Sequence, residues 1–347
     1  MAGRRRSYPQ AVETLPATDY WSTEVHDAER HTIFGREWLC LGPADAVTEP
    51  GSYLAETVAG WPVLVVRDGQ GELRSFHNVC RHRAGPLVDD GAGACRSLVC
   101  RYHGWAYGLD GGLRSARDSG LDDEELAGLS LYDVRVGVWR GLLFVCLAPD
   151  TEPLDGWIGG LAGQCGEYPM ESWRPGRRLV HHLGCNWKTY SDNYLEGYHI
   201  PLVHPALSRA IEPSSYTVEV GDGWARHRAL TREGVAATGT WLWKWPNLAV
   251  NLYEHGMSVE RWLPTGPASC VLILDFCFDG TGPDAEARNE VDIAASSVIC
   301  QEDKAICEAV QRNLQGGVYD VGLLSPRHEA GVADFHRRVR AARLVPR

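Results

Sequence analysis

Short apolar runs interrupted by turn residues fill the chain between about residues 38 and 150. Runs at 63–67, 73–76, 97–100 and 142–146 are separated by Gly, Asp and Asn, which is the pattern of short strands joined by tight turns. The stretches 68–71 and 110–112 have the Asp-Gly composition of hairpin turns. The pattern predicts a small all-β domain over 38–150, preceded by an N-terminal arm and a helix over 1–37.

The predicted N-terminal helix runs from about 19 to 38. Thr18 or Asp19 is expected to cap it, and His26, Ile33 and Phe34 are expected on its inner face. A Pro-containing linker near 150–157 then leads into a second half in which helical and strand-like segments alternate.

The second half, 151–347, is predicted to be an α+β domain in which an antiparallel sheet packs on a long helix. Strand-like runs occur at 180–185, 216–220, 240–245, 248–253 and 270–278, and a helix is expected at 187–196. The longest helix should span about 285–314. Its expected apolar face is formed by Ile293, Val298, Ile299, Ile306 and Val310.

Composition narrows the class of protein. The chain has 347 residues and a net charge of -11, and nucleic-acid binders usually show a basic footprint instead. Its 11 Cys show no disulfide-like framework, which fits a reducing cytoplasm. No apolar segment follows the basic start, and no run approaches the length of a membrane span. These features predict a cytoplasmic protein without a membrane or nucleic-acid partner.

Two short motifs in the β domain carry redox chemistry. Cys80-Arg-His82 and Cys100-Arg-Tyr-His103 each supply one thiolate and one imidazole. This is the ligand set of a Rieske [2Fe–2S] cluster, in which two His replace two Cys on one iron. A structural zinc site is the alternative, although zinc sites usually place the two Cys together and the two His together.

A second metal site is predicted in the α+β domain. His199 and His204 are five residues apart, with Pro201 between them to distort the helix and let them converge. Two His and one carboxylate form the ligand set of non-heme Fe(II) oxygenases. Asp303 is the preferred carboxylate and Glu302 the alternative. Glu196, three residues before His199, can orient that ring.

These residues together resemble the catalytic α subunits of Rieske non-heme iron oxygenases, over about 18–340. The resemblance implies that Cys80, His82, Cys100 and His103 bind the cluster and that His199, His204 and Asp303 bind the catalytic iron. It also implies a helix-grip (START-like) catalytic domain and a homotrimer, in which Glu196 carries electrons between subunits. Asn193 is a further catalytic candidate. Electrons would come from NAD(P)H through a separate flavin- or ferredoxin-type reductase.

The segment 192–199 is most similar to the branch that oxidises choline, glycine betaine and carnitine. The resemblance predicts N-demethylation or hydroxylation of a small quaternary ammonium compound. Trp241, Trp243 and Trp245 alternate along a predicted strand and, with Tyr253, are candidates for a cation-binding pocket. A packed core face is the alternative for this stripe. A hydroxylase of an aromatic or natural product, a pure electron carrier and a zinc-stabilised binding module remain as other functions.

Overall fold

The computed structural model describes residues 12–231, 239–280 and 282–344. The described chain forms two compact units. One is the continuous stretch Phe34–Trp157, and the other combines the residues up to Ile33 with those from Ile158 onwards. The first unit encloses the range 38–150 predicted for the β domain, while the N-terminal segment belongs with the second half of the chain.

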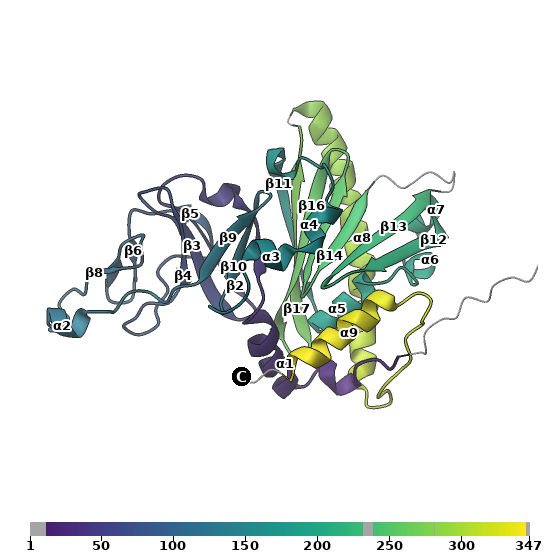
Figure 1. The fold of residues 1–347 in the computed structure, drawn as a ribbon, viewed down its shortest axis with the longest axis horizontal. Coiled ribbons are helices and arrows are strands. Elements are labelled where there is room, and N and C mark those ends of the chain that lie inside the picture. Colours follow the sequence, from purple (N-terminus) through teal and green to yellow (C-terminus); the bar gives the residue numbers. More distant parts are fainter. Residues whose placement is uncertain (1–11, 232–238, 281, 345–347) are drawn as a thin grey trace, which may run out of the picture. The chain divides into compact units, whose positions relative to one another are not determined.

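The Phe34–Trp157 unit is built from three small antiparallel sheets, as the all-β prediction required (Figure 1). One has the order β4-β3-β2-β5 and comprises Leu73–His77, Trp61–Arg67, Ser52–Val58 and Gly91–Ala94. The second, β1-β10-β9, comprises Leu39–Pro43, Leu142–Cys146 and Arg135–Trp139. The third, β6-β7-β8, comprises Leu98–Val99, Ala106–Tyr107 and Leu113–Ser115. The helices α2 (Asp123–Leu126) and α3 (Leu154–Ile158) are short.

A single seven-stranded antiparallel sheet organises the other unit (Figure 1). Its order is β11-β17-β16-β15-β14-β13-β12. In chain order the strands are Arg174–Leu183, Ile211–Val220, Trp224–Thr231, Thr240–Lys244, Leu248–Tyr253, Gly256–Gly266 and Ser269–Phe278. The sequence pattern missed β13 and β16, because their polar positions interrupt the apolar runs.

Helices cover this sheet, and their ends follow local sequence signals. Asn186 caps α5 (Trp187–Tyr194) by accepting a hydrogen bond from the Lys188 N–H at 2.9 Å. The long helix α8 (Pro283–Gln315) begins with a proline, which suits the first helical turn. The remaining helices are α4 (Gly160–Gln164), α6 (Ile200–Val203), α7 (Pro205–Ala210) and α9 (Ala330–Ala342), the last of which was not predicted.

The N-terminal helix is shorter than predicted. The helix α1 spans Thr23–Glu29 and continues as a wider π-helical turn over Arg30–Phe34. Ser22, rather than Thr18 or Asp19, caps it, because its side chain accepts a hydrogen bond from the Val25 N–H. Ile33 and Phe34 are fully buried, as expected for its inner face.

The predicted apolar face of α8 is wrong for most of its members. Ile293 is buried, but Val298, Ile306 and Val310 are 52%, 38% and 40% exposed. The buried side of α8 instead carries mostly polar or thiol side chains: Asn289, Ile293, Cys300, Asp303, Cys307, Gln311 and Leu314. The side of α8 that is buried against the sheet therefore carries Asp303 and other polar or thiol side chains, not the predicted apolar stripe.

A buried ionic cluster joins three segments that are distant in sequence. The Lys188 Nζ lies 2.6 Å from Glu29 Oε2, and both side chains are almost fully buried. Arg343 contributes a second contact, 2.8 Å from Glu29 Oε1. The cluster thus connects α1, α5 and the end of α9 within one unit. No described helix is both long and apolar enough to cross a membrane.

Candidate functional site

The two Cys–His motifs lie on two similar tight loops of the Phe34–Trp157 unit. In each loop the Cys N–H donates to the carbonyl five residues later, at Gly85 and at Trp105, with both distances 2.9 Å. In each loop the Cys carbonyl also accepts from the N–H four residues later. The two loops thus hold Cys80 and Cys100 in matching positions, with His82 two residues and His103 three residues further along.

Within the loops the thiols are buried and the imidazoles are exposed. Cys80 and Cys100 are 3% and 2% exposed, and their thiols lie within hydrogen-bonding contact. His82 and His103 are exposed, with ring centroids 4.6 Å apart. This separates the donors into an inner sulfur pair and an outer nitrogen pair, which suits a two-iron cluster.

The space beside the cluster thiols has no room for a side chain at position 85. A Cβ atom at Gly85 would lie only 2.7 Å from Cys100 Sγ. The Tyr107 hydroxyl lies 3.3 Å from Cys80 Sγ and accepts a hydrogen bond from the Arg81 N–H. Hydrogen bonds to ligand sulfur are one means by which proteins tune a cluster. The residues present therefore fit a [2Fe–2S] group.

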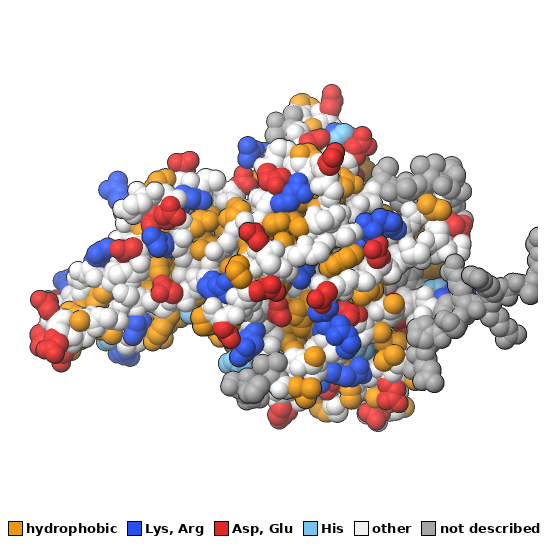
Figure 2. Space-filling model, viewed as in Figure 1, with side chains coloured by type: hydrophobic (Ala, Val, Ile, Leu, Met, Phe, Trp, Pro, Cys, Tyr) orange, Lys and Arg blue, Asp and Glu red, His pale blue; other side chains and the backbone are white. Residues whose placement is uncertain are grey.

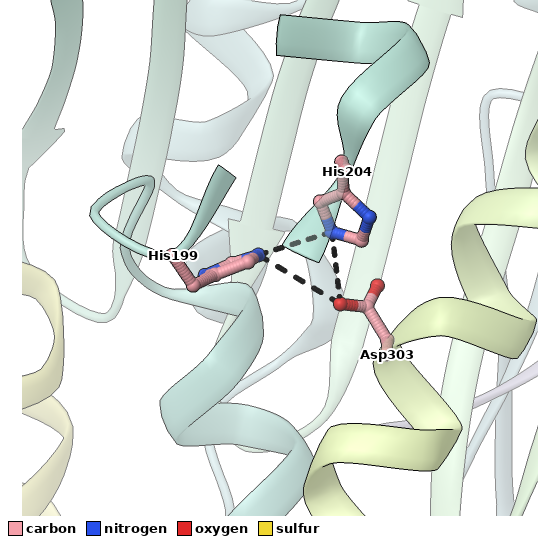
Figure 3. Close-up of side chains that lie close together, drawn as sticks. All are labelled: His199, His204 and Asp303. Carbon is pink, nitrogen blue, oxygen red and sulfur yellow. Dashed lines mark hydrogen bonds and ion pairs between the residues drawn. The ribbon is translucent and has the colours of Figure 1, made fainter. Parts of the chain in front are cut away.

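The other predicted donors converge on one point in the second unit (Figure 3). His204 Nε2 lies 3.1 Å from His199 Nε2 and 3.0 Å from Asp303 Oδ1. The distance from His199 Nε2 to Asp303 Oδ1 is 3.7 Å. Within the described ranges, this is the one set of three His, Cys or carboxylate donors whose ligand atoms all lie within 4.8 Å of one another.

Two separate elements supply these donors. His199 and His204 flank the short helix α6, in which Pro201 occupies the first turn, and Asp303 comes from the middle of α8 (Figure 3). The short helix, rather than a continuous one, brings two His five residues apart into contact. Two imidazoles and one carboxylate with an open side can hold a divalent iron ion.

Carboxylates also hold the opposite nitrogen of each imidazole. Glu196 Oε1 lies 2.5 Å from His199 Nδ1, and Glu302 Oε2 lies 2.7 Å from His204 Nδ1. Such contacts fix the tautomer and orientation of a metal-binding His. Glu302 therefore lies behind His204, whereas Asp303 faces both rings. Asn193 Nδ2 donates to Asp303 Oδ1 at 2.7 Å.

The electrostatics of His204 reflect these carboxylates. Burial alone would lower its pKa, but the hydrogen bonds and charges of Asp303 and Glu302 outweigh burial and raise the pKa. The pKa of the third imidazole in the cavity, His227, shifts the other way. Burial, followed by the charge of His199, lowers the pKa of His227 to about 3.

A cavity of about 300 Å³ opens beside the three donors. Strands of the sheet line one side, and α5, α6 and α8 line the other. Aromatic side chains form much of the lining: Tyr190, Tyr194, Tyr216, Trp241, Tyr253, Phe276 and Phe278. Tyr194, Tyr216 and His227 were not singled out from the sequence, because an isolated aromatic or His carries no spacing signal.

The predicted tryptophan stripe is divided between cavity and core. Trp241 lines the cavity, and its indole N–H donates to the Tyr253 hydroxyl at 3.2 Å. Trp243 and Trp245 are 1% and 6% exposed and pack against Phe335 of α9. Of the three pocket candidates, Trp241 alone lines the cavity. Trp243 and Trp245 form the packed core face that was the alternative, because α9 covers that part of the strand.

A buried carboxylate in the cavity was also missed. Glu260, in the middle of the apolar strand β16, is 7% exposed. Its Oε1 accepts a hydrogen bond from Asn251 Nδ2 at 2.7 Å. Burial, and secondarily the charge of Asp303, raises the pKa of Glu260 to about 7.

Both units match known family models. The Rieske [2Fe-2S] domain model matches residues 37–126. The model of the ring hydroxylating alpha subunit (catalytic domain) matches residues 170–238 and 223–343. The two matches place the Cys–His loops in the first family region and the His–His–Asp site in the second.

Curated relatives extend the similarity over nearly the whole chain. Choline monooxygenase of Beta vulgaris, a chloroplastic protein, is 32% identical across 94% of this chain and 76% of its own length. The oxygenase subunit of carnitine monooxygenase from Escherichia coli K12 is 26% identical across 94% of this chain and 93% of its own length.

Solved structures agree with the fold. The quaternary ammonium Rieske monooxygenase CntA, in complex with L-carnitine, superposes with a TM-score of 0.86 at 24% identity, over 96% of each chain. A naphthalene 1,2-dioxygenase gives 0.77 at 21% identity, over 93% of this chain and 90% of that one. At these identities the matches establish the shared two-domain architecture.

Proposed function

Because the chain belongs to the Rieske non-heme iron oxygenase α subunits, in the branch of choline and carnitine monooxygenases, we propose that it oxidises a C–H bond of a small quaternary ammonium compound. The reaction is N-demethylation or hydroxylation. The observation that carries the proposal is the His199–His204–Asp303 site, which opens on a cavity lined by aromatic side chains. Aromatic faces attract quaternary ammonium groups.

The enzyme is an oxygenase component with a Rieske [2Fe–2S] cluster, a mononuclear iron and electrons from a separate reductase. When bound, these groups deliver single electrons and activate O₂. We assign Cys80 and Cys100 to one cluster iron, and His82 and His103 to the other. His199, His204 and Asp303 are assigned to the catalytic iron, because their donor atoms converge on one point.

The carboxylates around the site have positioning roles. Glu196 holds the Nδ1 side of His199 and Glu302 holds that of His204, so that both rings present Nε2 to the same point. Asn193 holds Asp303 Oδ1. Glu196 is also proposed as the carboxylate on the electron path between subunits. Its support here is its 2.5 Å contact with His199.

A homotrimer is part of the proposal. Two exposed features support an interface between subunits. The His82 and His103 rings are exposed on their own unit, and Tyr198 and Leu202, which flank His199, are 60% and 89% exposed on theirs. A cytoplasmic setting, with an NAD(P)H-dependent flavin or ferredoxin-type reductase, completes the proposal. It fits the eleven cysteines, which form no disulfide in the described structure.

The test is substrate-dependent O₂ uptake by the iron-loaded protein with a surrogate reductase. The panel contains choline, glycine betaine, carnitine, proline betaine and several aromatic acids. Formaldehyde, or a hydroxylated product, in proportion to O₂ consumed with one ammonium compound is the expected result. Coupled uptake with an aromatic acid alone would replace this proposal with the second candidate, an aromatic hydroxylase, which the same aromatic lining also suits.

A further inference from the structure

We propose that this cavity selects cations that carry no carboxylate, such as choline-type amino alcohols, over betaines and carnitine, and that Glu260 is the residue that makes the selection. The inference rests on the function proposed above and narrows its substrate class. It follows from the charges that line the cavity and from the way Glu260 is held.

The described lining of the cavity, which leaves out residues 232–238, is acidic. Besides the proposed ligand Asp303 and its neighbour Glu196, it contains Glu260 and Asp292, and it contains no Lys or Arg. Its third imidazole, His227, has a pKa lowered to about 3 by burial and is therefore uncharged near neutral pH. Apart from the proposed iron, the described lining thus offers a cation several partners and offers a carboxylate no cationic side chain.

Glu260 has polar neighbours but no described basic partner. Asn251 Nδ2 donates to its Oε1 at 2.7 Å and also contacts Ser258 Oγ at 3.1 Å. The Tyr194 hydroxyl donates to Asn251 Oδ1 at 2.8 Å, which fixes the direction in which the Asn251 amide points. This network orients the carboxylate without neutralising its charge.

The sheet register places aromatic side chains on the same face of the sheet as this carboxylate. Trp241 is paired with Asn251, Asn251 with Ser258, and Ser258 with Phe276 across four neighbouring strands. Side chains that are paired in this way lie on the same face of the sheet. Glu260 and Tyr253 lie two positions further along their strands, on that same face.

A buried carboxylate among aromatic faces is complementary to a trimethylammonium group. The aromatic rings supply cation–π attraction. Glu260, whose pKa burial raises to about 7, supplies a charge partner in its ionised form, which a bound cation favours in a medium of low dielectric constant. A betaine would bring its own carboxylate into the same cavity of about 300 Å³. It would meet like charge and have no cationic side chain to replace its lost hydration.

Binding to the iron-loaded, reduced enzyme under anaerobic conditions tests this selection. Isothermal titration calorimetry would compare choline, glycine betaine and 3,3-dimethyl-1-butanol, which has the shape of choline without its charge. We expect choline to bind at least about tenfold more tightly than the other two. Equal or tighter binding of glycine betaine overturns the inference without any variant.

Variants then assign the effect to Glu260. In Glu260→Gln, choline affinity should fall about tenfold or more, while that of the uncharged analogue should not change. Glu260→Asp keeps the charge and should keep most of the preference. Glu254→Gln removes an exposed carboxylate that directly follows β15 and should change nothing. An unchanged choline-to-betaine ratio in a folded Glu260→Gln protein assigns the selection elsewhere and overturns the role of Glu260.

The outcomes separate the two proposals. If no ammonium compound binds or is oxidised while an aromatic acid is, the proposed function fails. If betaines or carnitine are bound and oxidised better than choline, the proposed function stands and only the selection by Glu260 fails.

Discussion

The two metal-binding regions are built on opposite plans. The cluster loops place all their donors within one short stretch, with buried thiols and exposed imidazoles. The His199–His204–Asp303 site draws its donors from two distant elements and is enclosed beside a cavity. One region can exchange electrons at the surface of its unit, whereas the other controls what reaches its metal.

Removing a donor from one region should leave the other intact. Asp303→Ala removes the carboxylate that faces both imidazoles, so we expect loss of the mononuclear iron and at least about a thousandfold loss of turnover. Iron analysis and the visible spectrum of the cluster measure the two sites separately.

The reciprocal variant, His103→Ala, should lose cluster absorption and keep the mononuclear iron. Asp292→Asn is the matched control for Asp303→Ala, because Asp292 lines the same cavity from the same helix. For the first variant, full retention of iron by the Asp303→Ala protein would show that Asp303 is not a ligand.

A second test concerns the carboxylates that contact the Nδ1 atoms of His199 and His204. Glu196→Ala should keep both metal groups and slow turnover about 10- to 100-fold, because His199 loses its 2.5 Å partner. Single-turnover kinetics on the pre-reduced enzyme measure the effect. Normal turnover with both groups retained would exclude the role of Glu196, and Glu219→Gln on β12 serves as an exposed control.

The cluster region should instead be sensitive to steric change. Gly85→Ala places a methyl group 2.7 Å from Cys100 Sγ, so we expect a clear loss of cluster content with the mononuclear iron unchanged. Gly69→Ala is the control, because nothing lies within 4 Å of a Cβ at that position. Equal cluster absorption in both variants would show that the loop adapts to the extra atom.

The smallest expected effect is a dependence of folding stability on pH, which arises from His227 beside the His199–His204–Asp303 site. The pKa of His227 falls to about 3 in the folded chain, below the ordinary value near 6.5. Folding therefore favours the neutral ring, and this stabilisation is complete above about pH 6.5 and lost progressively as the pH falls toward 3.

Denaturant titrations at several pH values would compare the wild type with His227→Gln. The stability difference between the two proteins should shrink as the pH falls from about 7 to 4. A difference that does not vary over this range would contradict the role assigned to burial of the neutral ring.

The contrast between the regions also explains what the sequence could predict. The cluster motif is local, and each donor is fixed by its own loop, so Cys80 to His103 could be identified directly. The third ligand had to come from a distant helix, and the sequence preferred Asp303 while leaving Glu302 as the alternative. The two differ in which side of His204 they contact, and this depends on tertiary packing.

Packing likewise overrode the sequence pattern elsewhere. The apolar positions Val298, Ile306 and Val310 suggested the inner side of α8, but the buried side of this helix carries mostly polar and thiol side chains. Trp243 and Trp245 resembled Trp241 in spacing, yet α9 covers them. The sequence pattern did not indicate Glu260, because a single carboxylate within an apolar strand forms no periodic pattern.

The unit that holds the mononuclear site is interrupted in the chain by the other unit, and this has a consequence for biosynthesis. During translation the whole Phe34–Trp157 stretch is synthesised before Arg343. Glu29 is synthesised early but cannot form its ion pair with Arg343 until that residue has been added. At ordinary translation rates the wait between synthesis of Glu29 and synthesis of Arg343 is roughly 15–60 s. During that time the N-terminal helix has no C-terminal partner, so a truncation before Arg343 should compromise the first helix of the chain as well as the last.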